Sequence, residues 1–155
     1  MSSTRLPGKV LKKVLGKTLL EYQIERLRAV QLADDIVIAT TINHADDPIV
    51  DLCQLLNVSH MRGSEEDVLA RYSEAAVSNQ ADIIVRITSD CPLIDPALID
   101  LVLGYYLKHT SEYEYVSNTL KQSYPSGMAV EVFPIKVLQE AHVEAKALLE
   151  REHVT

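Results

Sequence analysis

Short apolar runs along the chain alternate with stretches in which apolar residues recur every three or four positions. Three runs have the length and character of strands buried inside a sheet, Ile36–Ala39, Val58–Met61 and Ile83–Ile87. The stretches between them gather their apolar side chains on one face, as an amphipathic helix does. Strands that alternate with helices in this way indicate βαβ units with right-handed crossovers. The pattern therefore predicts an α/β fold with a mainly parallel, Rossmann-like sheet flanked by helices.

Local signals mark where two of the predicted helices begin. Thr18 and Glu21 have the spacing of a capping box, in which each residue satisfies a backbone amide of the other. Asp95 and Pro96 combine a favoured N-cap with a proline at the first helical position. We therefore expect helices to start directly after Thr18 and Asp95.

The second half of the chain is less regular. We expect strands at Tyr113–Val116 and Met128–Phe133, separated by a Tyr-Pro-Ser-Gly turn. One final helix is predicted from an apolar stripe at helical spacing, made of Val137, Leu138, Ala141, Ala145 and Leu148. No repeat or low-complexity linker interrupts the sequence, so we predict a single domain over residues 1–155.

Composition and charge narrow the class of protein. The chain has 155 residues and a net charge of −7, which argues against binding nucleic acid through a basic surface. No run approaches the 18 or so apolar residues of a membrane span, and the polar, basic start is unlike a signal peptide. The two cysteines lie far apart and form no metal-type pair. We therefore expect a cytoplasmic protein that binds neither nucleic acid nor a membrane.

The polar turn after the run at Ile83–Ile87 is the strongest candidate for a site. Asp90 falls just past the end of this strand, at the edge where open α/β sheets bind their ligands. A carboxylate there suits a hard cation such as Mg²⁺, and the alternative is that Asp90 only shapes the turn. Cys91 beside it is a second candidate, as a nucleophile, although no partner histidine is evident.

The first nine residues, M-S-S-T-R-L-P-G-K, form a second candidate segment. Hydroxyl groups, a glycine and the two cations Arg5 and Lys9 are what a phosphate-binding loop requires, because backbone amides and positive charge hold the anion. The alternative is a frayed, basic N-terminus.

Five motifs in order resemble those of a known family. They are S-T-R-L-P-G-K at 3–9, R-G-S-E-E-D-V-L at 62–69, S-D-C-P-L-I-D-P at 89–96, Y-P-S-G at 124–127 with E-V-F at 131–133, and E-R-E-H-V-T at 150–155. Together they resemble the cytidylyltransferase family that includes spore coat polysaccharide biosynthesis protein F. The first motif is also similar to that of the wider CMP-sugar synthetases. The resemblance implies a fold of the nucleotide-diphospho-sugar transferase type.

The resemblance also implies a reaction and a set of site residues. A hydroxyl of a sugar or sugar acid would attack the α-phosphate of CTP in surface polysaccharide biosynthesis, and pyrophosphate would leave. The residues that the motifs imply are Arg5, Lys9 and Asp90 as catalytic, Asp90 as the Mg²⁺ ligand, Ser3, Thr4, Arg62, Gly63, Ser64 and Asp67 along the nucleotide, and Tyr124, Gly127 and Glu131 on the acceptor side.

Two of these residues have an equally plausible structural interpretation. Asp67 has the position of a helix cap, and Glu131 would lie on the solvent face of a strand whose residues alternate. The functional and structural interpretations of both residues stay open at this point.

The sequence also differs at both ends from the pattern of the family that it resembles. The first strand and an arginine that contacts phosphate are missing, and relatives continue past the final motif, so the chain is expected to be truncated at both ends. The missing strand would leave a sheet edge open, which predicts self-association as a homo-oligomer. Two other functions remain as alternatives, a non-catalytic remnant that binds nucleotide and a glycosyltransferase that uses a nucleotide-sugar.

Overall fold

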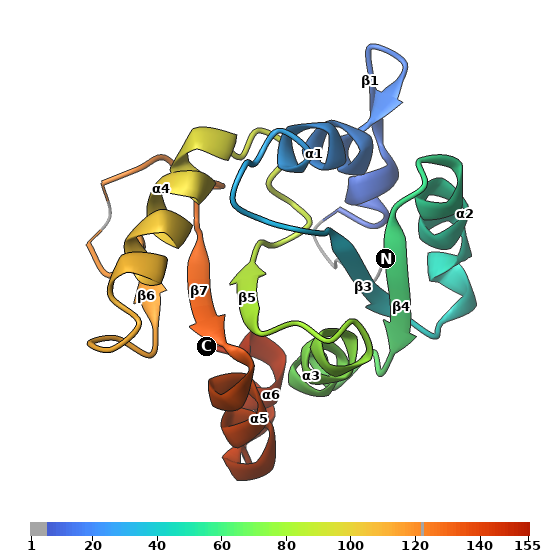
Figure 1. The fold of residues 1–155 in the computed structure, drawn as a ribbon. Coiled ribbons are helices and arrows are strands. Elements are labelled where there is room, and N and C mark those ends of the chain that lie inside the picture. Colours follow the sequence, from blue (N-terminus) through green and yellow to red (C-terminus); the bar gives the residue numbers. More distant parts are fainter. Residues whose placement is uncertain (1–5, 122) are drawn as a thin grey trace. The chain divides into compact units, whose positions relative to one another are not determined.

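The computed structural model describes residues 6–121 and 123–155, and its alternating helices and strands confirm the α/β class (Figure 1). Its helices are α1 (Leu19–Leu27), α2 (Asp47–Leu55), α3 (Val68–Ser78), α4 (Pro96–Lys108), α5 (Ile135–Glu144) and α6 (Leu148–His153), with short 3-10 turns η1 (Lys9–Leu11) and η2 (His44–Asp46). Its strands are β1 (Lys13–Val14), β2 (Lys17–Thr18), β3 (Val37–Thr41), β4 (Ser59–Gly63), β5 (Ile83–Arg86), β6 (Val116–Ser117) and β7 (Glu131–Pro134). Within the described ranges, each helix is too short or too polar to cross a lipid bilayer.

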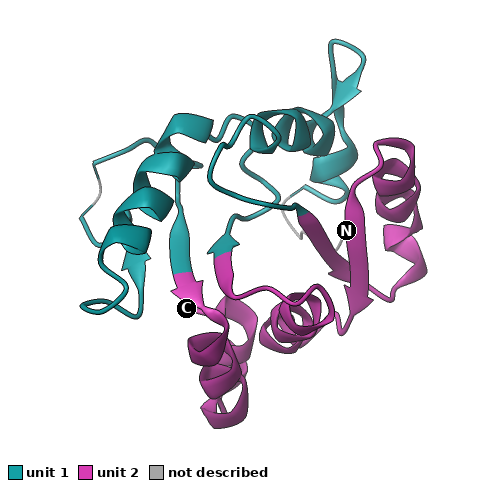
Figure 2. Cartoon of the chain, viewed as in Figure 1, with its two compact units in different colours: residues 1–36, 85–132 teal, residues 37–84, 133–155 magenta. Residues whose placement is uncertain are grey.

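The chain divides into two compact units (Figure 2). Unit 1 comprises residues 1–36 and 85–132, and unit 2 comprises residues 37–84 and 133–155. The chain passes from one unit to the other directly before β3, within β5 and within β7. Each unit has buried apolar side chains of its own, including Leu20, Ile24, Ile94 and Ile99 in unit 1 and Ile49, Cys53, Leu69 and Leu138 in unit 2.

Unit 2 contains the predicted βαβ unit. Strands β3 and β4 pair in parallel, from Val37 opposite Ser59 to Thr41 opposite Gly63, and α2 connects them. Helix α3 contacts both strands and also packs against α5 and α6. The carboxyl ends of β3 and β4 therefore meet at one edge, where Arg62 and Gly63 lead into the next turn.

Unit 1 is organised around α1. The predicted capping box is confirmed, because Thr18 Oγ1 accepts from the Glu21 amide and the Glu21 carboxylate accepts from the Thr18 amide. The side-chain amide of Gln23 donates to the carbonyl oxygen of Thr88 across 2.8 Å. Arg26 Nε donates to the carbonyl oxygen of Ile94 across 2.5 Å. Helix α1 therefore holds the polar turn after β5 on both sides of Asp90.

The strands form three sheets in the described part of the chain. Strands β1 and β2 make an antiparallel hairpin, β3 and β4 make the parallel pair, and β7 lies between β5 and β6. Strands β6 and β7 are antiparallel, with Val116 opposite Val132. The predicted strands Ile36–Ala39, Val58–Met61 and Ile83–Ile87 are confirmed within a residue or two at their ends.

Both late strands are shorter or later than predicted. Strand β6 begins only at Val116, and β7 begins at Glu131 rather than Met128. The side chain of Asn118 accounts for the late start of β7, because it accepts from the Val130 amide and donates to the Met128 carbonyl. These backbone groups are satisfied by a side chain instead of by a neighbouring strand.

The prediction of one final helix was wrong, because α5 and α6 are separate. The backbone at Ala145 is extended, and side chains on α6 satisfy the groups that the break leaves open. Glu150 accepts from the amides of Lys146 and Ala147, each across 3.0 Å. Arg151 Nη1 donates to the carbonyl oxygens of His142 and Ala145. These bonds cap both sides of the break.

Candidate functional site

Unit 1 brings two predicted site residues together at the polar turn after β5. Lys9 Nζ donates a hydrogen bond to Asp90 Oδ2 across 2.6 Å, although 81 residues separate the two in the sequence. The Lys9 and Asp90 side chains keep 30% and 46% of their surface exposed, so a ligand can reach both. The predicted phosphate-binding lysine and the predicted metal ligand are therefore direct neighbours.

The carboxylate of Asp90 is ionised at neutral pH. The hydrogen bond from Lys9 holds the pKa of Asp90 below its ordinary value, with help from Thr88 and against partial burial. Because Gln23 fixes the backbone of Thr88, the turn that carries this charge is itself anchored to α1. The geometry therefore presents a negative charge on an anchored turn directly beside a positive one.

Cys91, the residue after Asp90, is buried. Its Sγ is 3.2 Å from Thr88 Oγ1, and burial raises the pKa of the Cys91 thiol. A thiol with a raised pKa is mostly protonated and is a poor nucleophile. The alternative in which Cys91 is the nucleophile therefore finds no support in this geometry.

Gly127 faces the same turn from another segment. A β-carbon placed on Gly127 would lie 3.9 Å from Cys91 Sγ, and its φ of +89° is one that other residues rarely adopt. Tyr124 and Gly127 line a cavity of about 190 Å³, together with Asn118, Thr119, Pro125, Ser126, Met128 and Ala129. Two of the predicted acceptor-side residues thus line a common cavity, and one of them adjoins the turn that holds Asp90.

Glu131, the third predicted acceptor-side residue, lies in a buried cluster. Its carboxylate pairs with Arg86 Nη1 and accepts from the Tyr115 hydroxyl across 2.7 Å. The Arg86 and Glu131 side chains are only 14% and 12% exposed. The interpretation of Glu131 as a solvent-facing residue was wrong, because its side chain is mostly buried and balances the charge of Arg86.

In unit 2, Arg62 braces the turn that follows β3. Its Nε donates to the carbonyl oxygen of Thr41 and its Nη2 to that of Asn43, each across 2.8 Å. Its Nη1 forms an ion pair with Asp47 Oδ1 at 2.7 Å. The guanidinium thus joins the ends of β3, α2 and β4, and the contact of Arg62 with a nucleoside stays a prediction.

Gly63 and Ser64 continue from Arg62 into the loop before α3. A β-carbon on Gly63 would lie 3.1 Å from Arg71 Cγ and 3.2 Å from Glu74 Oε2, so glycine allows β4 to approach α3 closely. Ser64 Oγ accepts from the Asp67 amide across 3.1 Å, and its carbonyl oxygen accepts from Arg71. The start of the loop is therefore tied to its end at Asp67 and to Arg71 on α3.

Asp67 is the helix cap that the sequence allowed. Its Oδ1 accepts from the Ala70 amide across 2.9 Å, at the start of α3. Its Oδ2 accepts from Arg151 Nε across 2.7 Å. Sequence reasoning missed the role of Arg151, although the E-R-E-H-V-T motif that contains it was a signal. Whether Asp67 also contacts a nucleotide stays a prediction.

Three of the predicted site residues lie outside the described part of the chain: Ser3, Thr4 and Arg5. Among the described residues, no group of three or more His, Cys, Asp or Glu side chains is placed to hold a metal ion. Asp90 nevertheless fits the way proteins commonly bind Mg²⁺, through one or two carboxylates together with phosphates of the substrate.

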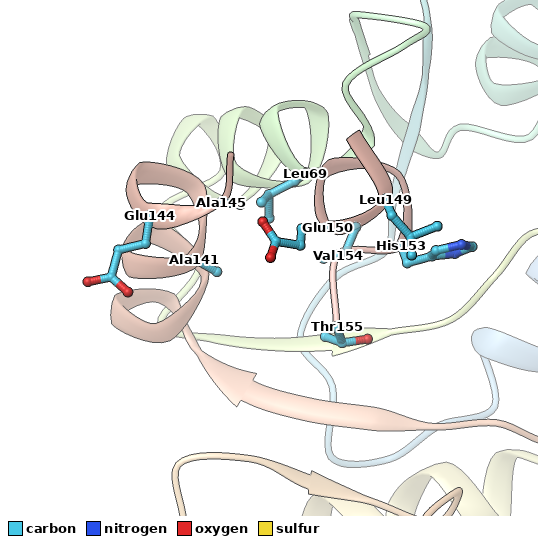
Figure 3. Close-up of a pocket in the computed structure, with 9 residues that line it drawn as sticks. All are labelled: Leu69, Ala141, Glu144, Ala145, Leu149, Glu150, His153, Val154 and Thr155. Carbon is cyan, nitrogen blue, oxygen red and sulfur yellow. The ribbon is translucent and has the colours of Figure 1, made fainter. Parts of the chain in front are cut away.

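A larger pocket of about 630 Å³ lies in unit 2 (Figure 3). Most of its lining is apolar and comes from α3, α5, α6 and the residues after α6, including Leu69, Ala141, Leu149 and Val154. Figure 3 shows Leu69 and Glu150 between the helices, whereas the Glu144 side chain points away. The pocket contains none of the predicted site residues, and its apolar lining is unsuited to a phosphate.

Comparison with known proteins identifies relatives that cover the whole chain. The cytidylyltransferase family model matches residues 1–155. An uncharacterised protein of Methanocaldococcus jannaschii is 42% identical over 153 residues, which cover 99% of this chain and 61% of that protein. The spore coat polysaccharide biosynthesis protein SpsF of Bacillus subtilis is 33% identical over 160 residues, which cover 100% of this chain and 65% of that protein.

A solved structure extends the comparison to the fold. The structure of a cytidylyltransferase from Leptospira borgpetersenii matches with a TM-score of 0.95 at 35% identity, covering 99% of this chain and 65% of that one. The chain thus spans less than two thirds of the length of each of these three relatives. Because the family model matches from residue 1 to residue 155, the chain belongs to the cytidylyltransferase family.

Proposed function

We propose that the chain serves a CTP-dependent transfer of CMP to a sugar or sugar acid, with release of pyrophosphate, in surface polysaccharide biosynthesis. Membership of the cytidylyltransferase family supports CMP as the group that is transferred. The name of the B. subtilis relative supports a role in polysaccharide biosynthesis. The observation that carries the proposal is the pair formed by Lys9 and Asp90 at the exposed turn after β5.

The proposed reaction needs positioning and charge neutralisation more than covalent help from the protein. The acceptor hydroxyl gives its proton to solvent water and forms a bond to the α-phosphorus of CTP, while the bond from that phosphorus to the departing pyrophosphate breaks. Negative charge on the phosphate oxygens must be balanced throughout. Lys9 can supply part of this balance directly, and Asp90 would supply another part through a bound Mg²⁺.

The opposite charges of the pair match those of a metal-bound triphosphate. In the proposed complex, Lys9 would bind anionic oxygens of the β- and γ-phosphates in place of the Asp90 carboxylate. Asp90 would hold Mg²⁺ in place of the ammonium group, and the metal would neutralise phosphate charge. Lys9 would therefore exchange one anionic partner for another, and Asp90 one cationic partner for another. This exchange limits the free-energy cost of breaking the ion pair.

The other predicted residues extend this proposal within each unit. In unit 1, the cavity lined by Tyr124 and Gly127 adjoins the turn that holds Asp90, and we assign it to the acceptor. In unit 2, we assign the loop from Arg62 to Asp67 to the nucleoside. Self-association as a homo-oligomer also stays a proposal.

A pyrophosphate assay tests the proposed function. The protein is incubated with Mg²⁺, each of the four nucleoside triphosphates in turn, and a panel of neutral sugars and sugar acids. We expect pyrophosphate only when CTP and a suitable acceptor are both present. Binding of CTP without turnover would favour the non-catalytic alternative, and the absence of any CTP binding would overturn the proposal.

A further inference from the structure

Arg151 connects three segments of unit 2. Its Nε donates to Asp67 Oδ2 across 2.7 Å. Its Nη1 donates to the carbonyl oxygens of His142 and Ala145, across 3.1 Å and 3.0 Å, and its Nη2 lies 3.2 Å from His142 Nδ1. One guanidinium on α6 therefore contacts the end of α5 and the loop before α3.

The bond to Asp67 acts on the loop that the sequence assigns to the nucleotide. Both oxygens of the Asp67 carboxylate are engaged, Oδ1 by the Ala70 amide and Oδ2 by Arg151. The Asp67 amide in turn donates to Ser64 Oγ. Fixing the Asp67 side chain therefore fixes the backbone of residue 67 and the orientation of the Ser64 hydroxyl.

Burial and charge indicate that this contact is well defined. The Arg151 and Asp67 side chains are only 21% and 28% exposed, so solvent screens their attraction less than it would at the surface. An arginine can bind a carboxylate and two carbonyl oxygens at once because its donors point in fixed directions. A lysine at the same position could replace one of these bonds but not the whole set.

We propose that Arg151 is a positioning residue, which acts through Asp67 to hold the loop from Arg62 to Asp67 in the conformation that receives a cytidine nucleotide. This inference rests on the proposed function. In this role Asp67 orients the loop, and Arg151 in the final motif of the sequence contributes to nucleotide affinity. The loop would then contact the nucleoside through the groups that Asp67 and Arg151 hold in place.

The test compares nucleotide affinity in folded variants of the whole chain. Arg151→Gln, Arg151→Lys, Asp67→Asn and the double variant Arg151→Gln/Asp67→Asn are prepared, with Glu152→Gln as a control on the same helix. Calorimetric titration gives the dissociation constants of CTP and CMP for each protein. Urea unfolding followed by circular dichroism verifies that each is folded under the conditions of the titration.

We expect Arg151→Gln to weaken CTP and CMP alike, by about tenfold, because displaced supporting groups commonly cost that much. CTP and CMP share the nucleoside, so a defect in this loop affects both. Arg151→Lys should restore part of the affinity, and Glu152→Gln should match the parent. In the double variant the losses should not add, since the two residues act as one unit.

A folded Arg151→Gln protein with the parent's affinities would overturn the inference while leaving the proposed function intact, as would additive losses in the double variant. If Arg151→Gln does not fold, the CTP and CMP affinities of Arg151→Lys and Asp67→Asn test the inference instead. Weaker binding of both nucleotides would support it, and the parent's affinities in both variants would overturn it. Asp67→Asn should fold because asparagine is still a good helix cap. If the parent binds neither nucleotide, the proposed function fails and this inference fails with it.

Discussion

Lys9 and Asp90 form an ion pair at 2.6 Å, although they stand 81 residues apart in the sequence. Each residue is anchored by a different local feature, Lys9 by the turn η1 and Asp90 by the turn that α1 holds through Thr88. The pair is partly exposed, so its contribution to the stability of the fold is small. In the proposed function, the pair instead binds a ligand that needs both charges.

Replacing Lys9 should distinguish binding of the β- and γ-phosphates from binding of the rest of the nucleotide. We expect Lys9→Ala to weaken CTP binding by roughly ten- to a hundredfold, because a charge-assisted hydrogen bond contributes roughly 1.5–3 kcal/mol. CMP should be affected less, since it lacks the β- and γ-phosphates. Calorimetric titration of both nucleotides provides the measurement. Lys12→Ala, which removes an exposed lysine from the same segment, is the control, and equal effects on CTP and CMP would contradict the assignment.

Replacing Asp90 should remove the metal-dependent part of CTP binding. Asparagine keeps the shape of aspartate and can still accept a hydrogen bond in the turn, but it lacks the charge that Mg²⁺ requires. For Asp90→Asn we expect titrations with and without Mg²⁺ to give similar CTP affinities, whereas Mg²⁺ should strengthen CTP binding to the parent.

A neighbouring carboxylate provides the control for this variant. Asp95 caps α4 through the Ala97 amide, and Asp95→Asn should preserve that cap. This control protein should respond to Mg²⁺ as the parent does. A Mg²⁺ response that survives in Asp90→Asn would show that Asp90 acts only in the turn.

Much of the fold follows from signals that lie close together in the sequence. Thr18 caps α1 and Asp95 caps α4 as predicted, because a cap depends on residues only two or three positions away. The break between α5 and α6 was not predicted, since the apolar stripe continues through it. That break is stabilised by Glu150 and Arg151 on α6, whose side chains bond to the backbone between the two helices.

The site shows the same division between local and distant signals. Motifs selected Lys9 and Asp90, but only the fold shows that they touch. The inward position of Glu131 depends on Arg86, 45 residues away, so strand alternation alone could not reveal it. Arg151 reaches Asp67 over 84 residues, which explains why its role was missed even though its motif was recognised.

The cluster around Glu131 should matter for stability. Glu131→Gln leaves the charge of Arg86 without its carboxylate in a site where both side chains are mostly buried. We expect a loss of about 2 kcal/mol in the free energy of unfolding, below the range for fully buried pairs. Tyr115→Phe, which removes only the hydroxyl that donates to Glu131, should cost about 1 kcal/mol. Urea unfolding followed by circular dichroism measures both, and an unchanged midpoint for Glu131→Gln would contradict this account.

Acid should weaken the fold partly through Asp67. Burial opposes ionisation of this carboxyl, but the hydrogen bond from the Ala70 amide and the contacts with Arg151 outweigh it, so the pKa of Asp67 lies below its ordinary value of 3.8. A folded-state pKa below the unfolded one means that the unfolded chain binds more protons in the interval between them. The stabilisation from Asp67 is therefore fully present above the ordinary value and is lost as the pH falls through the folded value.

The measurement is the free energy of unfolding at a series of pH values from neutral to strongly acidic, in the parent and in Asp67→Asn. The chain has no tryptophan, so circular dichroism is the suitable signal. Other carboxylates titrate equally in both proteins, and the difference between the two curves isolates residue 67. We expect the parent to be more stable at neutral pH and the two curves to converge below the ordinary aspartate pKa. Curves that stay parallel throughout would show that the ionised Asp67 carboxylate does not stabilise the fold.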